Sequence, residues 1–307
     1  MLFYGRRLKK REIRCAIFST KAFPKPMKPE KRKIKAAGRD SRYNAGDTYM
    51  FVTTKALVLR EVKYKEADRI LTVISEYGGI MTVKARGALR KNSKLASATQ
   101  QLCFSEMTLF FTRGKWSVNE ASTIETFSGL QEDFEAYALG CYVAECVEAV
   151  AVEDQPDPAL MQLALNTLYA LSRKMYGTDA IKAAFELRLM ALAGYTPDVN
   201  SCAVCGKTEP ERPYLSLSDG CIRCAACRGT AFDAPVGLSA ESLAAMRYIL
   251  SAPSKKLFSF SMSEEGQREL SDAAESYLLR QTERSFSSLD YWKKLRYAFP
   301  RFSIKPH

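Results

Sequence analysis

Residues 56–83, ALVLREVKYKEADRILTVISEYGGIMTV, decide the fold of the first half of the chain. The segment contains three short apolar runs, 56–59, 70–74 and 80–83, rich in the Val, Ile and Leu residues that favour strands. Tyr77-Gly78-Gly79 separates the second run from the third and has the composition of a tight hairpin turn. The segment therefore predicts consecutive antiparallel strands.

The strand pattern continues to Phe127. The turn Thr112-Arg113-Gly114-Lys115 joins the run Phe104 to Phe111 with a strand around Trp116. Five short strands between residues 51 and 127 predict a small closed barrel.

After Phe127 the apolar period changes from two to nearly four, which indicates helices. Ser128 is the expected N-cap of the first one, with Glu132 and Asp133 in its first turn. Further helices are expected at about 158–176, 178–193, 239–250 and 263–292, with cysteines and turns at 200–230. The fold class is therefore α+β and multidomain.

Five of the nine cysteines lie between residues 202 and 227. Cys202/Cys205 and Cys224/Cys227 form two C-x-x-C pairs at the spacing of a tetrahedral zinc ribbon, so we expect one structural Zn²⁺. Cys221/Cys224 is an alternative second pair, and whether Cys221 replaces a ligand stays open. A set of reduced thiols or a disulfide framework is the competing interpretation, but disulfides fit poorly with a chain that lacks an export signal.

The sole histidine is His307, the last residue. A zinc site in the folded part should therefore be all-thiolate and closed, without the open position of catalytic zinc. Nucleophile–histidine arrangements are implausible for the same reason, and neither a phosphate-binding loop motif nor a G-x-G-x-x-G motif occurs. We expect a protein that is not an enzyme, and a zinc-dependent hydrolase or deaminase is disfavoured.

The net charge of +12 is concentrated at the start of the chain. Residues 1–49 hold 15 Lys and Arg and four acidic residues, which leaves the remainder nearly neutral. This leader is expected to be disordered. Met50 directly precedes the first strand, so the leader is either an upstream extension of a gene that starts at Met50, which we favour, or a functional basic arm.

The charge of the remaining chain is segregated. Ten cations and four acids lie between residues 55 and 94, whereas residues 116–172 hold ten acids and no Lys or Arg. A basic barrel suits the phosphate backbone of a nucleic acid, and Phe104, Phe110, Phe111 and Trp116 are either base-stacking residues or, as we favour for most, barrel core. The acidic block should repel phosphates, dock a basic partner or simply form a solvated face. The candidate DNA-binding residues are Lys55, Arg60, Lys63, Lys84, Arg86, Arg90, Lys91 and Lys94.

Several segments resemble the RecO family of bacterial recombination mediators. They are ALVLR at 56–60, YKEADRI at 64–70, SEYGGI at 75–80, KARGA at 84–88 and KNSKL at 91–95. The cysteine pairs match a family pattern in which Cys221 stands at a glycine, which supports Cys202, Cys205, Cys224 and Cys227 as the ligands. The segment from Arg284 to Tyr291 resembles the closing helix of the family, although Ser287 replaces a lysine.

The resemblance implies an OB-fold barrel at 50–128, a helical domain at 129–199 and 231–295, and a zinc-ribbon insertion at 200–230. It also implies a function in DNA repair and homologous recombination. Such a protein binds single- and double-stranded DNA and anneals complementary strands. With RecR, it helps to load RecA onto single-stranded DNA coated by single-strand-binding protein. It also binds the C-terminal tail of single-strand-binding protein.

The alternative function is that of a zinc-ribbon RNA-binding or ribosome-associated adaptor, which would share the basic barrel without the repair partners. No stretch approaches the roughly 20 apolar residues of a membrane-spanning helix, so no membrane partner is expected. We expect a cytoplasmic, nucleoid-associated protein.

Overall fold

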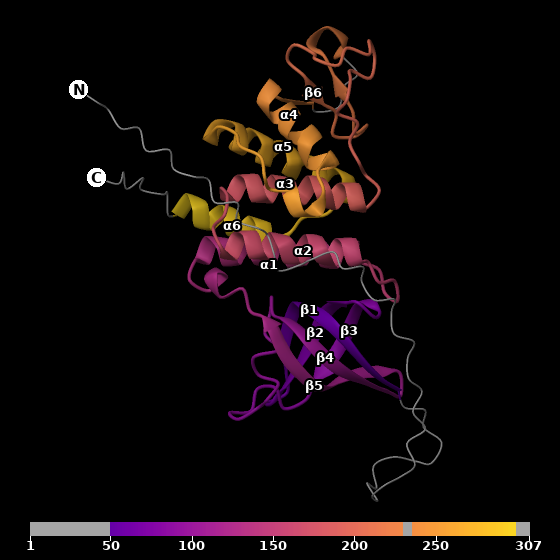
Figure 1. Ribbon diagram of the computed structural model, residues 1–307, viewed down its shortest axis with the longest axis vertical. Coiled ribbons are helices and arrows are strands. Elements are labelled where there is room, and N and C mark those ends of the chain that lie inside the picture. Colours follow the sequence, from indigo (N-terminus) through magenta and orange to yellow (C-terminus); the bar gives the residue numbers. More distant parts are fainter. Residues whose placement is uncertain (1–49, 230–234, 299–307) are drawn as a thin grey trace, which may run out of the picture.

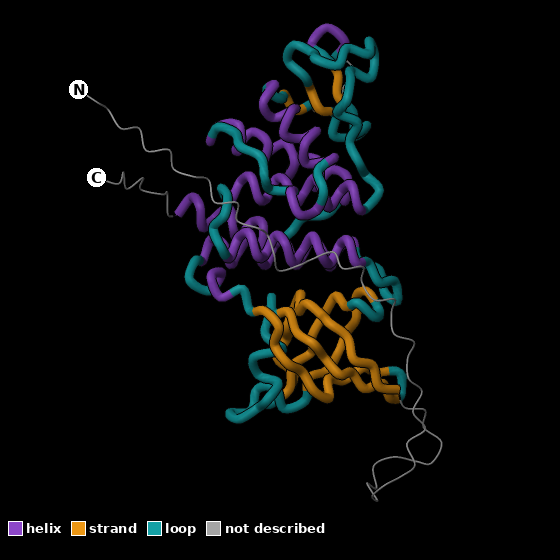
Figure 2. Tube along the Cα trace, viewed as in Figure 1, coloured by secondary structure: helices purple, strands orange, loops and turns teal. Residues whose placement is uncertain are grey.

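The structure is a computed structural model that describes residues 50–229 and 235–298. The expected leader, residues 1–49, lies outside the described residues, as does His307. A β-barrel forms one end of the molecule, stacked helices form the middle, and a small cysteine-rich ribbon forms the opposite end (Figures 1 and 2). Within the described residues, no helix is long and apolar enough to cross a membrane.

Five strands form a closed barrel in the order β1-β2-β3-β5-β4. Their bounds are β1 Met50–Tyr64, β2 Asp68–Ser75, β3 Gly79–Ala85, β4 Phe104–Thr112 and β5 Lys115–Glu125. β1 pairs with both β2 and β4, and β3 pairs with β5 in parallel, which closes the barrel as in an OB fold. The predicted barrel is therefore confirmed.

Six α-helices follow the barrel in the part of the chain that the structure describes. They are α1 Phe134–Val150, α2 Pro158–Ser172, α3 Thr178–Leu192, α4 Ala240–Ser251, α5 Glu264–Thr282 and α6 Ser287–Ala298. The predicted N-cap at Ser128 is wrong, because Ser128 begins a short 3₁₀ turn and α1 is capped by Asp133, which accepts hydrogen bonds from the N–H groups of Glu135 and Ala136. The single helix expected at 263–292 is also wrong, because α5 ends at Thr282 and its C-cap residue, Glu283, has a left-handed φ of 51°.

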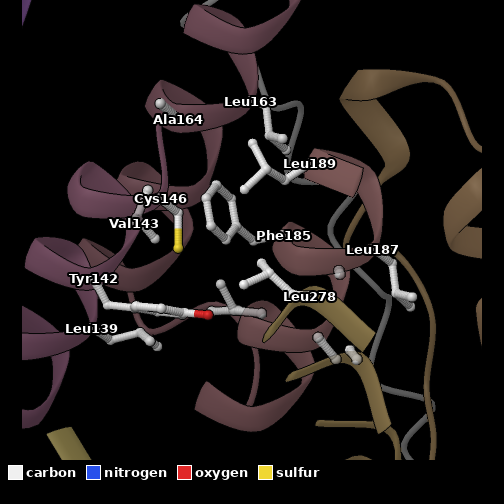
Figure 3. Close-up of a cluster of buried hydrophobic side chains, with 14 of the residues drawn as sticks. Leu139, Tyr142, Val143, Cys146, Leu163, Ala164, Phe185, Leu187, Leu189 and Leu278 are labelled. Atoms are coloured by element: carbon white, nitrogen blue, oxygen red, sulfur yellow. The ribbon is translucent and has the colours of Figure 1, made fainter. Parts of the chain in front are cut away.

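The helices and one end of the barrel share a core. Phe185 of α3 points toward Val143 and Cys146 of α1, and Tyr142 directs its hydroxyl into the same interior (Figure 3). From the barrel side, Leu57, Leu59, Ile74 and Phe104 belong to this core, whereas a separate cluster around Val58, Val73, Val83 and Met107 fills the barrel. A β-bulge between Val58 and Arg60 helps to turn Leu59 toward the helices.

Gly79 fixes the junction of barrel and helices. It has a φ of +61°, and a Cβ there would lie 2.4 Å from the carbonyl oxygen of Gln155 and 2.5 Å from that of Val152. The amide of Ile80 donates to the Val152 carbonyl at 3.3 Å, and the amide of Asp154 donates to the Gly78 carbonyl at 3.0 Å. Because any side chain at Gly79 would enter these contacts, the glycine is required for this approach.

A buried ion cluster joins four helices. Lys182 of α3 has a fully buried side chain whose Nζ lies 3.0 Å from a carboxylate oxygen of Glu186 and 3.0 Å from one of Glu275 of α5. The hydroxyl of Tyr142 of α1 donates to Glu186 at 2.7 Å. Lys293 of α6 contacts Glu275 from the other side. The cluster satisfies its charges internally, which is the condition for burying them.

Candidate nucleic-acid interface and metal centre

The loop that joins β3 to β4 carries four of the predicted DNA-binding cations, Arg86, Arg90, Lys91 and Lys94. All four are exposed. We call residues 86–94 the basic loop. Gly87, the second residue of the loop, has a φ of +65°, and its N–H donates to a carboxylate oxygen of Asp68 at 2.8 Å.

The base of this loop is held against the barrel. The amide of Leu89 donates to the carbonyl of Ala67 at 2.9 Å, and Ala88 is buried. Further along the connection, the guanidinium of Arg69 donates to the carbonyl of Ala96 at 2.9 Å and to the hydroxyl of Thr99 at 3.0 Å. The four cations therefore project from an anchored segment of the barrel surface.

The other predicted cations have different surroundings. Lys55 and Lys63 on β1 are exposed. Arg60 lies at the junction, where its guanidinium donates to Glu148 of α1 at 2.7 Å. Lys84 of β3 forms an ion pair with Asp68 at 2.8 Å, and this hydrogen bond, followed by that from Gly87, lowers the pKa of Asp68. Arg60 and Lys84 thus already have anionic partners within the chain.

The proposed stacking aromatics are mostly packed. Phe104 is 4% exposed and lies in the shared core, which removes it as a stacking residue. Phe110 lies half-buried beside Phe51, with ring centroids 4.8 Å apart, and Phe111 lies beside Trp116 at 4.9 Å. The core interpretation of Phe104 is therefore correct.

Sequence reasoning missed Tyr64. Its side chain is 42% exposed at the end of β1, and the other aromatic residues of the five strands are buried or half-buried. Val62, two residues earlier, is 50% exposed. The signal was the sequence Val62-Lys63-Tyr64-Lys65, where apolar residues alternate with lysines at a strand end.

The acidic block is largely engaged in the structure. Asp133 and Asp157 cap α1 and α2, and Glu148 pairs with Arg60. Glu145 of α1 accepts hydrogen bonds from the amides of Ser287, at 3.2 Å, and of Ser288, at 3.0 Å, so that it satisfies the N-terminus of α6. These four carboxylates stabilise the helical domain rather than forming a free acidic face.

The ribbon between α3 and α4 brings four predicted cysteines together. The Sγ atoms of Cys202, Cys205, Cys224 and Cys227 all lie within 4.8 Å of one another. Cys205 and Cys224 are 3.9 Å apart, and zinc–sulfur bonds of about 2.3 Å would separate the sulfurs of a tetrahedral site by roughly 3.8 Å. The group could therefore hold a metal ion. Cys221 lies outside it, as the choice of Cys224/Cys227 predicted.

The backbone around Cys202 favours its thiolate, whereas hydrogen bonds within the group raise the pKa of Cys227 to about 12. Burial raises the pKa of Cys202, but hydrogen bonds from the N–H groups of Cys205 and Cys224 outweigh it and lower the pKa to about 6. Gly206, directly after Cys205, has a φ of +71°, the conformation that lets this knuckle turn. Thiolate is the form in which cysteine binds metals.

The helices hold the ribbon in place. The strands β6 Tyr214–Leu215, β7 Ile222–Arg223 and β8 Val236–Gly237 form its small sheet. The Tyr277 hydroxyl of α5 donates to the carbonyl of Tyr195 at 3.0 Å, and Arg247 of α4 donates to that of Val199 at 2.8 Å. The four-cysteine group and the basic loop lie toward opposite ends of the molecule (Figure 1).

A closed barrel with an anchored basic loop, joined to a helical domain with a four-cysteine insertion, defines a multidomain α+β architecture. Family models for "Recombination protein O N terminal" and "Recombination protein O C terminal" match residues 50–127 and 131–290. The chain therefore belongs to the RecO family, which supports a role in DNA repair and recombination.

Individual relatives agree with the family models. The chain is 34% identical to the DNA repair protein RecO of Acetivibrio thermocellus over 245 residues, which are 80% of this chain and 97% of that protein. It is 29% identical to the DNA repair protein RecO of Alkaliphilus metalliredigens over 248 residues, 80% of this chain and 100% of the relative. The matches support the predicted family resemblance over nearly the whole length of these relatives.

Proposed function

We propose that this protein is a recombination mediator that binds single- and double-stranded DNA through its barrel and anneals complementary strands. The observation that carries the proposal is the basic loop, in which four exposed cations project from an anchored segment of a RecO-family barrel. Lys and Arg side chains bind phosphates without reading sequence and release counterions as they do so. Cations between two strands also reduce the repulsion that opposes annealing.

The proposed activity requires no covalent chemistry, and we propose that the protein is not an enzyme. The barrel would hold the DNA backbone while bases pair. In the proposed pathway RecR acts with this protein to load RecA, and the helical domain docks the C-terminal tail of single-strand-binding protein. These steps would take place in the cytoplasm, at the nucleoid.

The four-cysteine group would hold one structural Zn²⁺. The supports are the mutual distances of the sulfurs and the all-sulfur donor set, which zinc prefers in closed sites. Cys202, Cys205, Cys224 and Cys227 would position the ribbon against α4 and α5. Zinc would supply folding free energy to a segment whose sheet has two-residue strands.

The test removes the cations of the basic loop. Changing Arg86, Arg90, Lys91 and Lys94 together to Ala should weaken DNA binding and strand annealing. The slope of log affinity against log salt should decrease by up to about 3 for single strands and about 4 for duplex DNA if each cation neutralises one phosphate. Affinity measured across a salt series, with annealing of labelled complementary strands, gives both quantities.

The matched control removes four positive charges from the surface outside the barrel. Lys207, Lys255, Lys256 and Lys294 are exposed lysines outside the barrel, and changing them to Ala should leave the salt slope nearly unchanged. Equal binding by the loop variant and the wild type would show that the loop is ordinary solvated surface. Tighter binding of RNA than DNA without annealing would favour the RNA-binding adaptor instead.

A further inference from the structure

Tyr64 lies on the outer face of the barrel beside two cations. The ammonium group of Lys84 is 4.7 Å from the centre of its ring, and that of Lys65 is 5.7 Å away. Lys84 is held there by its 2.8 Å ion pair with Asp68, the residue that pairs with Tyr64 across the β1–β2 hairpin. Lys65 has an exposed side chain and forms no ion pair within the part of the chain that the structure describes.

The strand register continues this surface toward the middle of the barrel. Val62 pairs with Ile70 of β2, and Ile70 pairs with Lys84 of β3. Residues that are opposite one another, or two apart along a strand, share one face of a sheet. Val62, Tyr64, Ile70 and Lys84 therefore form one apolar and cationic patch, which we call the Tyr64 patch.

The patch occupies the position at which OB folds bind oligonucleotides, the face of strands two and three together with the loop between strands one and two. Its chemistry fits the same ligand class. An exposed ring offers a flat surface for a base, and Lys65 and Arg86, which lies close enough to act on Asp68, offer positive charge to the flanking phosphates.

We infer that Tyr64 stacks on an unpaired base and so makes the barrel distinguish single-stranded from duplex DNA. The inference rests on the proposed DNA-binding function and adds a contact separate from the basic loop. The loop binds phosphates, which both forms of DNA present, whereas a base in a duplex is already stacked and paired. The contact is therefore lost when the complementary strand arrives, which favours binding of the substrate of annealing over its product.

The first experiment compares two ligands, an oligothymidine and a duplex of the same length, across a salt series. Tyr64→Leu should lower affinity for the oligothymidine by about 5- to 100-fold, the range for losing one stacked base. Affinity for the duplex should change less than about twofold, and the salt slope should stay the same because no charge is removed. Tyr64→Phe keeps the ring and should bind like the wild type.

A control and a spectroscopic readout separate stacking from a loss of folding. Ile124, 46% exposed on β5, is a matched apolar residue on another strand, and Ile124→Ala should bind both ligands normally. Tyr64→Trp should retain affinity, and its fluorescence should be quenched by oligothymidine beyond the change seen for the wild type, which contains Trp116 and Trp292.

The outcomes distinguish this inference from the proposed function. Equal weakening of both ligands by Tyr64→Leu, or no weakening of either, would overturn the stacking role. If the basic-loop variant loses affinity while Tyr64→Leu does not, the inference fails and the proposed function stands. If the wild-type protein binds neither ligand, both fail.

Discussion

The barrel and the helical domain both contain many charged residues, but they use them differently. In the barrel, Arg86, Arg90, Lys91 and Lys94 face solvent. In the helical domain, carboxylates cap helix N-termini, as Asp133 does, or pair inside the core, as Glu186 does with Lys182. The charge of the basic loop is available to a ligand, whereas much of the charge in the helical domain stabilises the fold.

The comparison shows why a charge count is a weak guide to a binding surface. The block from residue 116 to 172 contains ten acids, yet several of them are structural partners. The basic loop has fewer charges, but those charges are exposed on an anchored segment. Substitutions in the helical domain should therefore change stability, and substitutions in the barrel should change DNA binding with little change in stability.

The largest expected effect is at the ribbon of the helical domain. Cys202→Ser should abolish stoichiometric zinc binding, because three thiolates and a hydroxyl form a much weaker site, and structural zinc supplies on the order of 10 kcal/mol to small zinc modules. Metal content by mass spectrometry and hydrogen exchange of residues 198–229 measure the loss of zinc and of local folding. DNA binding by the barrel should persist.

Cys221 provides the control for this variant. It lies in the same ribbon but outside the four-sulfur group, so Cys221→Ser should retain one zinc per chain. Loss of zinc in Cys221→Ser with retention in Cys227→Ser would show that the other C-x-x-C register holds the metal.

The next largest effect is at the buried ion cluster. At pH 8, where Glu186 is ionised, Lys182→Met leaves this carboxylate without its cation in a fully buried position, and breaking such a pair costs about 3–5 kcal/mol of unfolding free energy. Lys174→Met is the control, because that ion pair with Asp133 has a 64% exposed lysine and should contribute about 1 kcal/mol or less. Urea unfolding measures both, and a similar small loss in the two variants would contradict the assigned role of the cluster.

The features that the sequence predicted correctly are those determined by residues close together in the chain. The C-x-x-C spacing predicted the four-sulfur group, and Tyr77-Gly78-Gly79 predicted the turn between β2 and β3. Local signals were ambiguous at the start of α1, where Ser128 and Asp133 are both good caps. Leu130 is buried in the core and lies in the 3₁₀ turn that begins at Ser128, so that α1 starts only after Asp133.

The missed features depend on contacts between distant segments. Glu283 ends α5 in a left-handed conformation without the usual glycine, so the sequence from 263 to 292 looked continuous. The partners of Lys182 come from residues as distant as Glu275, which no sequence period connects.

The smallest expected effect is a pH dependence within the ion cluster. Burial raises the pKa of Glu186 to about 7, although Lys182 and the Tyr142 hydroxyl act in the opposite direction and Glu275 adds to the rise. The unfolded chain releases the proton near 4.5, so between these values the folded protein binds more protons than the unfolded one. The stabilisation of the folded protein by Glu186 is therefore fully present below about pH 4.5, and it decreases as the pH rises toward 7.

Glu186→Gln removes this titration while retaining the shape of the side chain. The unfolding free energy of the wild type, measured relative to Glu186→Gln, should decrease as the pH is raised from 5 to 8. Burial acts to raise the pKa of Glu275, but Lys182 and Lys293 outweigh it and lower this pKa. Glu275 therefore stays ionised from pH 5 to 8 and does not contribute to the pH dependence of the unfolding free energy. If the difference in unfolding free energy between the wild type and Glu186→Gln is constant or increases with pH, Lys182 keeps Glu186 ionised over the whole pH range, and the predicted titration is wrong.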